Sequence, residues 1–231
     1  MTTRKLFCFG HRGACGHAPE NTVSSVRKAL ELGADGVEVD VQFADGQLVV
    51  IHDDTLNRTT NGHGRLVKKS FAYLRSLDAG SGERIPTLAE IFDAVNRRGV
   101  INVELKGAHT AAPVSALIAE YVNHRGWSYD DFLVSSFDHA RIREAKQWCP
   151  GIRIGALTMK TPRGLAKFAE ALGAWSLHAS RRCVTPKLVA DAHRRGLKVF
   201  VFTINQPGEI TRMKTLGVDG VFSDFPERVV G

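Results

Sequence analysis

The sequence lacks the marks of a secreted, disulfide-linked or membrane-spanning protein. Its cysteines are scattered, with no C-x-x-C pair and no spacing typical of a metal site: Cys8, Cys15, Cys149 and Cys183. We therefore expect neither a disulfide framework nor a zinc site. Residues 1–10 contain only a short apolar run, residues 6–9, which is too brief for the core of a signal peptide or for a membrane span. These absences predict a cytosolic protein.

The sequence also lacks a long stretch of one charge. The formal net charge is +7, but basic residues come mostly as short pairs near predicted helix ends or in loops, such as Arg97-Arg98, Arg181-Arg182 and Arg194-Arg195. Cations are favoured at helix C-termini, whereas a nucleic-acid site presents a basic stripe. No amphipathic membrane helix is apparent. We therefore expect no nucleic-acid partner and no stable membrane insertion, and the sequence leaves both a monomer and a dimer open.

What the sequence has is an alternation of short apolar or β-branched runs with helical patterns, from end to end of 231 residues. The strand-like runs are 6–10, 36–41, 48–52, 100–105, 132–135, 153–157, 175–178, 198–203 and 220–223. The helical patterns lie at 22–32, 88–98, 113–124, 139–148, 162–171, 186–195 and 209–216. Repeated βα units in a chain of this length predict one α/β domain over residues 1–231, a TIM (β/α)8 barrel.

One strand-like run exceeds the number that such a barrel needs. Residues 48–52 follow the preceding strand too closely for a parallel crossover, so they must return antiparallel as a hairpin. We expect a three-residue loop that ends with Gly46 in the left-handed conformation, which would place His52 opposite Glu38. Residues 55–86, which follow, contain no clear strand and are rich in turn residues. They predict a loop-rich excursion over one rim of the barrel.

Acidic side chains stand at the ends of two predicted strands, where TIM barrels carry their working groups. Glu38 and Asp40 point to the same face of one strand, and Glu104 ends a later strand. Three carboxylates at one barrel mouth repel one another unless a cation neutralises them, and oxygen ligands select hard divalent ions. The sequence therefore predicts a site for Mg²⁺ or Ca²⁺. Internal ion pairs of these acids with Arg12 and Lys106 are the alternative.

Two histidines, His11 and His52, follow strands at the same predicted mouth. Imidazole titrates near neutrality, so one ring can accept a proton at one substrate oxygen while the other donates a proton at another. Arg12 and Lys106 would complement the negative charge of a phosphate. This combination suits paired proton transfers at a metal-bound phosphodiester.

These residues belong to short motifs that together resemble the glycerophosphodiester phosphodiesterases of the PLC-like phosphodiesterase superfamily. The motifs are His11-Arg12-Gly13, Pro19-Glu20-Asn21-Thr22, Glu38-Val39-Asp40-Val41, His52-Asp53-Asp54, Glu104-Leu105-Lys106 and Thr203-Ile204-Asn205. The run Asn57-Arg58-Thr59-Thr60-Asn61-Gly62 and the ending over residues 217–226 are similar to those of the small cytosolic bacterial members. Each tripeptide alone is weak, but their order along the chain makes the resemblance specific.

The resemblance implies an enzyme that hydrolyses glycerophosphodiesters, such as glycerophosphocholine or glycerophosphoethanolamine, to sn-glycerol 3-phosphate and an alcohol. It implies three sets of residues: a divalent-metal set (Glu38, Asp40, Glu104), an acid and base pair (His11, His52) and phosphate contacts (Arg12, Lys106). Whether a substrate hydroxyl or a metal-activated water attacks first stays open.

Other positions have a less defined expected role. Phe202 stands where the family often has tryptophan, and with His178 it is a candidate wall for the alcohol part of the substrate. Asn21 and Thr22 are typical of a helix start, so we expect Asn21 to support the residues that touch metal or substrate rather than to touch them. Two other functions stay open: a phospholipase D-like activity on lysophospholipids or sphingomyelin, and a barrel that binds phosphodiesters without catalysis.

Overall fold

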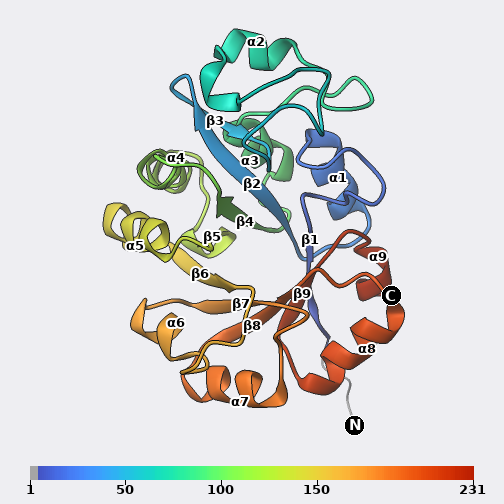
Figure 1. Ribbon diagram of the computed structural model, residues 1–231, viewed down its shortest axis with the longest axis vertical. Coiled ribbons are helices and arrows are strands. Elements are labelled where there is room, and N and C mark those ends of the chain that lie inside the picture. The colour runs from blue at the N-terminus through green and yellow to red at the C-terminus, as the bar shows by residue number, and fades with distance from the viewer. Residues whose placement is uncertain (1–4) are drawn as a thin grey trace.

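A computed structural model describes residues 5–231. Residues 1–4, which belong to the segment considered above for a leader, lie outside the described residues. The strands in chain order are β1 (Phe7–Gly10), β2 (Gly36–Ala44), β3 (Gln47–Val50), β4 (Val100–Leu105), β5 (Phe132–Ser136), β6 (Arg153–Thr158), β7 (Ser176–Ser180), β8 (Lys198–Phe202) and β9 (Gly220–Ser223). All but β3 pair in parallel around a ring, which β1 closes by pairing with both β2 and β9 (Figure 1). The predicted TIM barrel with one extra antiparallel strand is confirmed.

Helices surround this ring (Figure 1). They are α1 (Val23–Glu31), α2 (Phe71–Ser76), α3 (Leu88–Val95), α4 (Ala111–His124), α5 (His139–Trp148), α6 (Lys167–Ala171), α7 (Pro186–Arg194), α8 (Pro207–Leu216) and α9 (Glu227–Val230), with the 3-10 turns η1 (Leu66–Lys68) and η2 (Tyr129–Asp131). The predicted helix at 162–171 begins later than expected, because Leu165 has a positive φ of 51° that no helix tolerates. No helix in residues 5–231 is long and apolar enough to cross a membrane.

The hairpin between β2 and β3 differs from the prediction. Ala44 pairs with Gln47, so the loop has two residues, Asp45 and Gly46, with φ angles of 47° and 74°. Two positive φ angles are typical of a type I′ turn, whose twist matches that of the flanking strands. The three-residue loop, and with it the pairing of His52 with Glu38, is wrong. His52 instead lies two residues beyond the end of β3, where the strict alternation of strand side chains no longer applies.

The excursion at residues 55–86 lies at the top of Figure 1, beyond β3. It contains η1 and α2 and has a small hydrophobic core of its own, made of the buried side chains Leu56, Leu66, Leu74, Leu77 and Ile85 against Val49 and Ile51. Arg75 fastens it to α3 by two hydrogen bonds of 2.8 and 2.7 Å to the Glu90 carboxylate. The excursion is therefore a packed structure on the barrel rim rather than an open loop.

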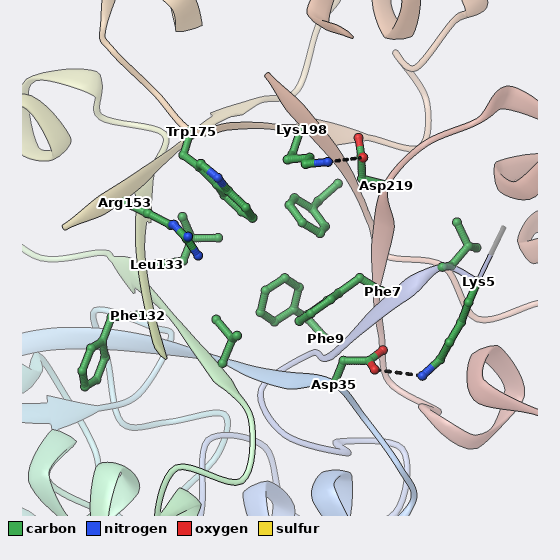
Figure 2. Close-up of a pocket in the computed structure, with 13 residues that line it drawn as sticks. Lys5, Phe7, Phe9, Asp35, Phe132, Leu133, Arg153, Trp175, Lys198 and Asp219 are labelled. Carbon is green, nitrogen blue, oxygen red and sulfur yellow. Dashed lines mark hydrogen bonds and ion pairs between the residues drawn. The ribbon is translucent and has the colours of Figure 1, made fainter. Parts of the chain in front are cut away.

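The interior of the barrel is filled by a cluster of buried side chains: Phe9, Leu133, Phe200 and Phe222. Below this cluster, at the N-terminal ends of the strands, lies a cavity of about 370 Å³ with an aromatic wall that includes Trp175 (Figure 2). Its charged groups are paired, Lys5 with Asp35, Lys198 with Asp219 and Arg153 with Asp130 outside the cavity. Because TIM barrels place their chemistry at the opposite end, the site must be sought above the cluster.

Candidate active site

A second cavity, of about 210 Å³, opens at the C-terminal ends of the strands. The residues that line it share that position: His11, Arg12, Glu38, His52, Asn102, Glu104, Lys106, Phe137, Leu157, Met159, His178, Phe202, Thr203 and Phe222. Among the residues that the sequence analysis gave a metal, catalytic, phosphate, wall or supporting role, only Asp40 and Asn21 do not line this cavity. Both are buried beside it. The segments that carry these residues are far apart in the chain, and the barrel brings them to one mouth.

The three acidic residues meet as the strand pattern predicts. Glu38 and Asp40 alternate with buried valines on β2, and the parallel register pairs Asp40 with Glu104 on β4. One carboxylate oxygen from each residue lies within 4.8 Å of the others. Burial and mutual repulsion raise the pKa of Glu38 and of Glu104. A cation at this position would relieve both effects, and the all-oxygen donor set fits a hard divalent ion.

The two basic residues neutralise this cluster only in part. Lys106 Nζ lies 3.0 Å from Glu104 Oε1 and 3.9 Å from Asp40 Oδ1, and Arg12 Nε lies 3.3 Å from Asp40 Oδ2. Glu38 accepts a hydrogen bond of 2.8 Å from the backbone N–H of Arg12, but no lysine or arginine of residues 5–231 forms a salt bridge with it. The ion-pair alternative therefore accounts for two of the acids and leaves the third without a cation.

Asn21 fixes Asp40 from behind. Its side-chain amide donates to Asp40 Oδ2 at 2.9 Å, and its Oδ1 accepts the backbone N–H of Asp40 at 3.0 Å. Thr22, not Asn21, caps α1, and Asn21 adopts a positive φ of 59° just before the cap. Asn21 therefore holds a residue of the carboxylate cluster through two hydrogen bonds, and it does not line the cavity.

His11 and His52 each present a ring whose Nδ1 contacts a carboxylate. His11 Nδ1 lies 2.6 Å from Asp224 Oδ1, and His52 Nδ1 lies 2.6 Å from Asp53 Oδ1. Burial alone would lower the pKa of His11, but the Asp224 hydrogen bond and the nearby Glu38 carboxylate raise it. With Nδ1 engaged in both rings, Nε2 is the nitrogen left to exchange protons in the cavity.

Asp224 is itself held by neutral donors. Asn205 Nδ2 donates to Asp224 Oδ2 at 2.6 Å, and Cys15 Sγ donates to Asp224 Oδ1 at 3.0 Å. Burial alone would raise the pKa of Asp224, but the hydrogen bonds, first of all that of His11, lower it to about 2. Asp224 is therefore ionised at neutral pH and available to orient His11.

The apolar side of the cavity holds the two residues predicted to form a wall. Phe202 packs edge-on against Phe137, with ring centroids 5.8 Å apart. His178 lies deeper: it is completely buried, Nε2 is 2.9 Å from Ser176 Oγ, and burial lowers its pKa to about 3. His178 is therefore neutral near pH 7 and lines the buried part of the cavity.

Comparison with known proteins finds a family that matches most of the chain. The model of the Glycerophosphoryl diester phosphodiesterase family matches residues 11–228. A glycerophosphodiester phosphodiesterase of Caldanaerobacter subterraneus subsp. tengcongensis is 35% identical over 98% of this chain and 97% of its own. Another, from Bacillus altitudinis, is 36% identical over 96% of each chain. The chain belongs to the glycerophosphoryl diester phosphodiesterase family.

A solved structure of a related phosphodiesterase shows the same barrel. The Oleispira antarctica phosphodiesterase, determined in complex with the product sn-glycerol-3-phosphate, is 34% identical, superimposes with a TM-score of 0.87, and the match covers 96% of this chain and 94% of that one. The protein is accordingly an enzyme, a phosphoric diester hydrolase. This sets aside the barrel that binds phosphodiesters without catalysis.

Two carboxylates that contact the histidines, those of Asp224 and Asp53, were given no role from the sequence. Asp224 directly follows β9, so the rule that strand ends carry working groups could have found it. Asp53 appeared in a quoted motif without a role, and only the structure shows that its carboxylate meets the ring of His52. Both are partners of a histidine rather than members of an obvious acidic pattern, so their role depends on tertiary contacts.

Proposed function

We propose that this enzyme hydrolyses glycerophosphodiesters, such as glycerophosphocholine and glycerophosphoethanolamine, to sn-glycerol 3-phosphate and the free alcohol, with a divalent cation and with His11 and His52 as acid and base. One observation carries the proposal: three neighbouring carboxylates lie at the same cavity as two histidine rings, and Nδ1 of each ring contacts a further carboxylate. The product bound in the Oleispira antarctica relative supports the same chemistry here.

Glu38, Asp40 and Glu104 would hold the cation, Mg²⁺ or Ca²⁺, since their oxygens converge and their mutual repulsion favours it. When bound, such an ion supplies charge neutralisation and polarisation of a phosphoryl oxygen. Asn21 keeps Asp40 in place as a ligand through its two hydrogen bonds.

The remaining residues would bind the phosphate and move protons. Arg12 and Lys106 border the cavity from two sides of the carboxylate cluster and can donate to non-bridging oxygens of the phosphate. Nε2 of one histidine would remove a proton from the attacking oxygen, and Nε2 of the other would protonate the leaving alcohol. Asp224 and Asp53 would hold the two rings in the tautomer that these transfers need.

The test is a hydrolysis panel with the purified protein, in which glycerophosphocholine, glycerophosphoethanolamine and bis(p-nitrophenyl) phosphate are assayed with Mg²⁺, with Ca²⁺ and with EDTA. We expect sn-glycerol 3-phosphate from the first two substrates, and loss of activity in EDTA that either cation restores. Release of glycerol and phosphocholine instead of sn-glycerol 3-phosphate and choline, or full activity in EDTA, would contradict the proposal.

A second candidate substrate class has one observation in its favour. Phe137 and Met159 line the cavity with side chains that are 41% and 56% exposed, next to Phe202. Such an apolar edge could hold an acyl chain, as a phospholipase D-like activity on lysophospholipids or sphingomyelin would need. Choline release from lysophosphatidylcholine at a higher kcat/KM than from glycerophosphocholine would favour that class.

A cytosolic location and the lack of a nucleic-acid partner stay predictions.

A further inference from the structure

The motif that begins at Asn57 is not used by the function proposed above, yet its arginine reaches the site. Arg58 comes from the start of the excursion, and its guanidinium lies between two carboxylates of the barrel. Nε and Nη2 donate to Asp53 at 2.7 and 2.9 Å, and Nη1 and Nη2 donate to Glu20 at 2.7 and 2.8 Å. The planar fork of an arginine is suited to two bidentate contacts at once, which the single ammonium of a lysine cannot reproduce.

Each of these carboxylates has a second partner, and that partner faces the cavity. Asp53 Oδ1 lies 2.6 Å from Nδ1 of His52, and Glu20 Oε1 accepts a hydrogen bond of 2.7 Å from Nη1 of Arg12. Arg58 is therefore one residue removed from both a proposed proton-transfer group and a proposed phosphate contact. Its own side chain does not line that cavity.

The contacts of Arg58 restrict both carboxylates. Hydrogen bonds from Arg58 hold the pKa of Asp53 far below its usual range. Burial alone would raise the pKa of Glu20, but Arg58 and Arg12 together lower it. Because each carboxylate uses both oxygens, its rotation is blocked, and the ring or guanidinium that it contacts on the cavity side is fixed in turn.

We propose that Arg58 is a positioning residue that orients His52 through Asp53 and Arg12 through Glu20, and so links the docked excursion to the acid-base and the phosphate-binding halves of the site. This inference rests on the proposed roles of His52 and Arg12. The excursion then contributes to the chemistry, because the barrel provides the two working side chains and the excursion provides the group that orients both.

The test is a pair of double-mutant cycles built on Arg58→Lys, which keeps the charge and removes the fork. Misplacement of a catalytic group by a fraction of an ångström to an ångström costs up to about 100-fold, so we expect kcat on glycerophosphocholine to fall about 10-fold and KM to rise about 10-fold. In an Asp53→Asn background, Arg58→Lys should no longer lower kcat but should still raise KM. In a Glu20→Gln background, it should no longer raise KM but should still lower kcat.

A second readout follows the ring itself. In ¹⁵N-labelled protein, the Nδ1–H tautomer of His52 should dominate in the wild type and should become mixed with the Nε2–H tautomer in Arg58→Lys. The matched control is Arg75→Lys, which breaks the bidentate pair with Glu90 that fastens the same excursion away from the cavity. It should lower the melting temperature and leave kcat, KM and the His52 signals unchanged.

The inference is overturned if the effects of Arg58→Lys on kcat and KM are the same in the two backgrounds as in the wild type, or if His52 keeps one tautomer in Arg58→Lys. An effect of Arg75→Lys as large as that of Arg58→Lys would also overturn it, because Arg58 would then act only by holding the excursion. Failure of the proposed function has a different signature: His52→Ala and Arg12→Met would themselves retain kcat and KM.

Discussion

The replacement of Asp224 by asparagine tests the site through a single oxygen. In the wild type, Asp224 Oδ1 faces the Nδ1–H of His11, and Oδ2 accepts from the side-chain amide of Asn205. An asparagine must place its NH₂ at one of these two positions. If the NH₂ faces Asn205, two donors meet; if it faces His11, the ring must flip to the tautomer with Nε2 protonated. In the first arrangement His11 keeps an acceptor for Nδ1–H but loses the negative charge beside it, and in the second it loses the tautomer with a free Nε2.

The cost can be worked out from these contacts. A buried donor left without its acceptor costs about 1–3 kcal/mol, and more when the lost partner is charged. At about 1.4 kcal/mol for each factor of ten in rate, Asp224→Asn should lower kcat roughly 10- to 100-fold. KM should change little, because Asp224 touches neither the carboxylate cluster nor Arg12 and Lys106 in the hydrogen bonds and salt bridges of residues 5–231.

The assay is steady-state release of sn-glycerol 3-phosphate from glycerophosphocholine, with the melting temperature measured on the same samples. Asp219→Asn is a matched control, since Asp219 Oδ2 contacts His193 Nε2 at 2.8 Å at the other end of the barrel. It should lower the melting temperature without lowering kcat. A kcat for Asp224→Asn within a factor of two of the wild type would refute the view that Asp224 orients His11.

Four further results are expected. His11→Ala or His52→Ala should lower kcat by roughly 10² to 10⁴ with metal binding retained by calorimetry, the usual loss for a proton-transfer group; near-normal rates across pH for His52→Ala would make the acid and base roles wrong. Glu104→Ala should weaken Mg²⁺ binding itself at least tenfold by calorimetry, and an unchanged affinity would remove Glu104 from the metal set. Leu74→Ala, in the core of the excursion, should lower the free energy of unfolding in urea by about 2–5 kcal/mol, and a loss below about 1 kcal/mol would mean that this core is loose. The pKa of Asp224 in the folded protein is about 2, below the ordinary value of 3.8, so its carboxylate stabilises the fold above pH 3.8 and loses this effect as pH falls toward 2. The difference in melting temperature between wild type and Asp224→Asn should therefore shrink over that range. A constant difference would speak against an ionised Asp224.

Most of the barrel could be predicted because its pattern is local. Apolar runs and turn residues mark the strands, and the predicted bounds at 100–105 and 220–223 match the structure residue for residue. Strand alternation also predicted that Glu38, Asp40 and Glu104 would meet, since parallel register follows from the barrel. The carboxylate cluster can therefore be predicted from the sequence.

What the sequence did not predict depends mostly on contacts between distant segments. The hairpin loop is the exception, because Asp-Gly is typical of a two-residue type I′ turn, and the three-residue expectation is wrong because it assumes that His52 lies opposite Glu38. The partner of His11 comes from the other end of the chain, and Arg58 acts across a gap of 38 residues to Glu20. No periodic pattern in the sequence indicates such hydrogen bonds.

The aromatic side chains inside the barrel have a consequence for how substrate enters the enzyme and how products leave it. The side chains of Phe9, Leu133, Phe200 and Phe222 fill the barrel between the cavity at the C-terminal ends of the strands and the cavity at the opposite end. We therefore expect the diester to enter, and the alcohol and the phosphate ester to leave, through the same opening at the C-terminal ends of the strands. The last product to leave blocks the next molecule from entering, and sn-glycerol 3-phosphate should therefore act as a competitive inhibitor of its own production.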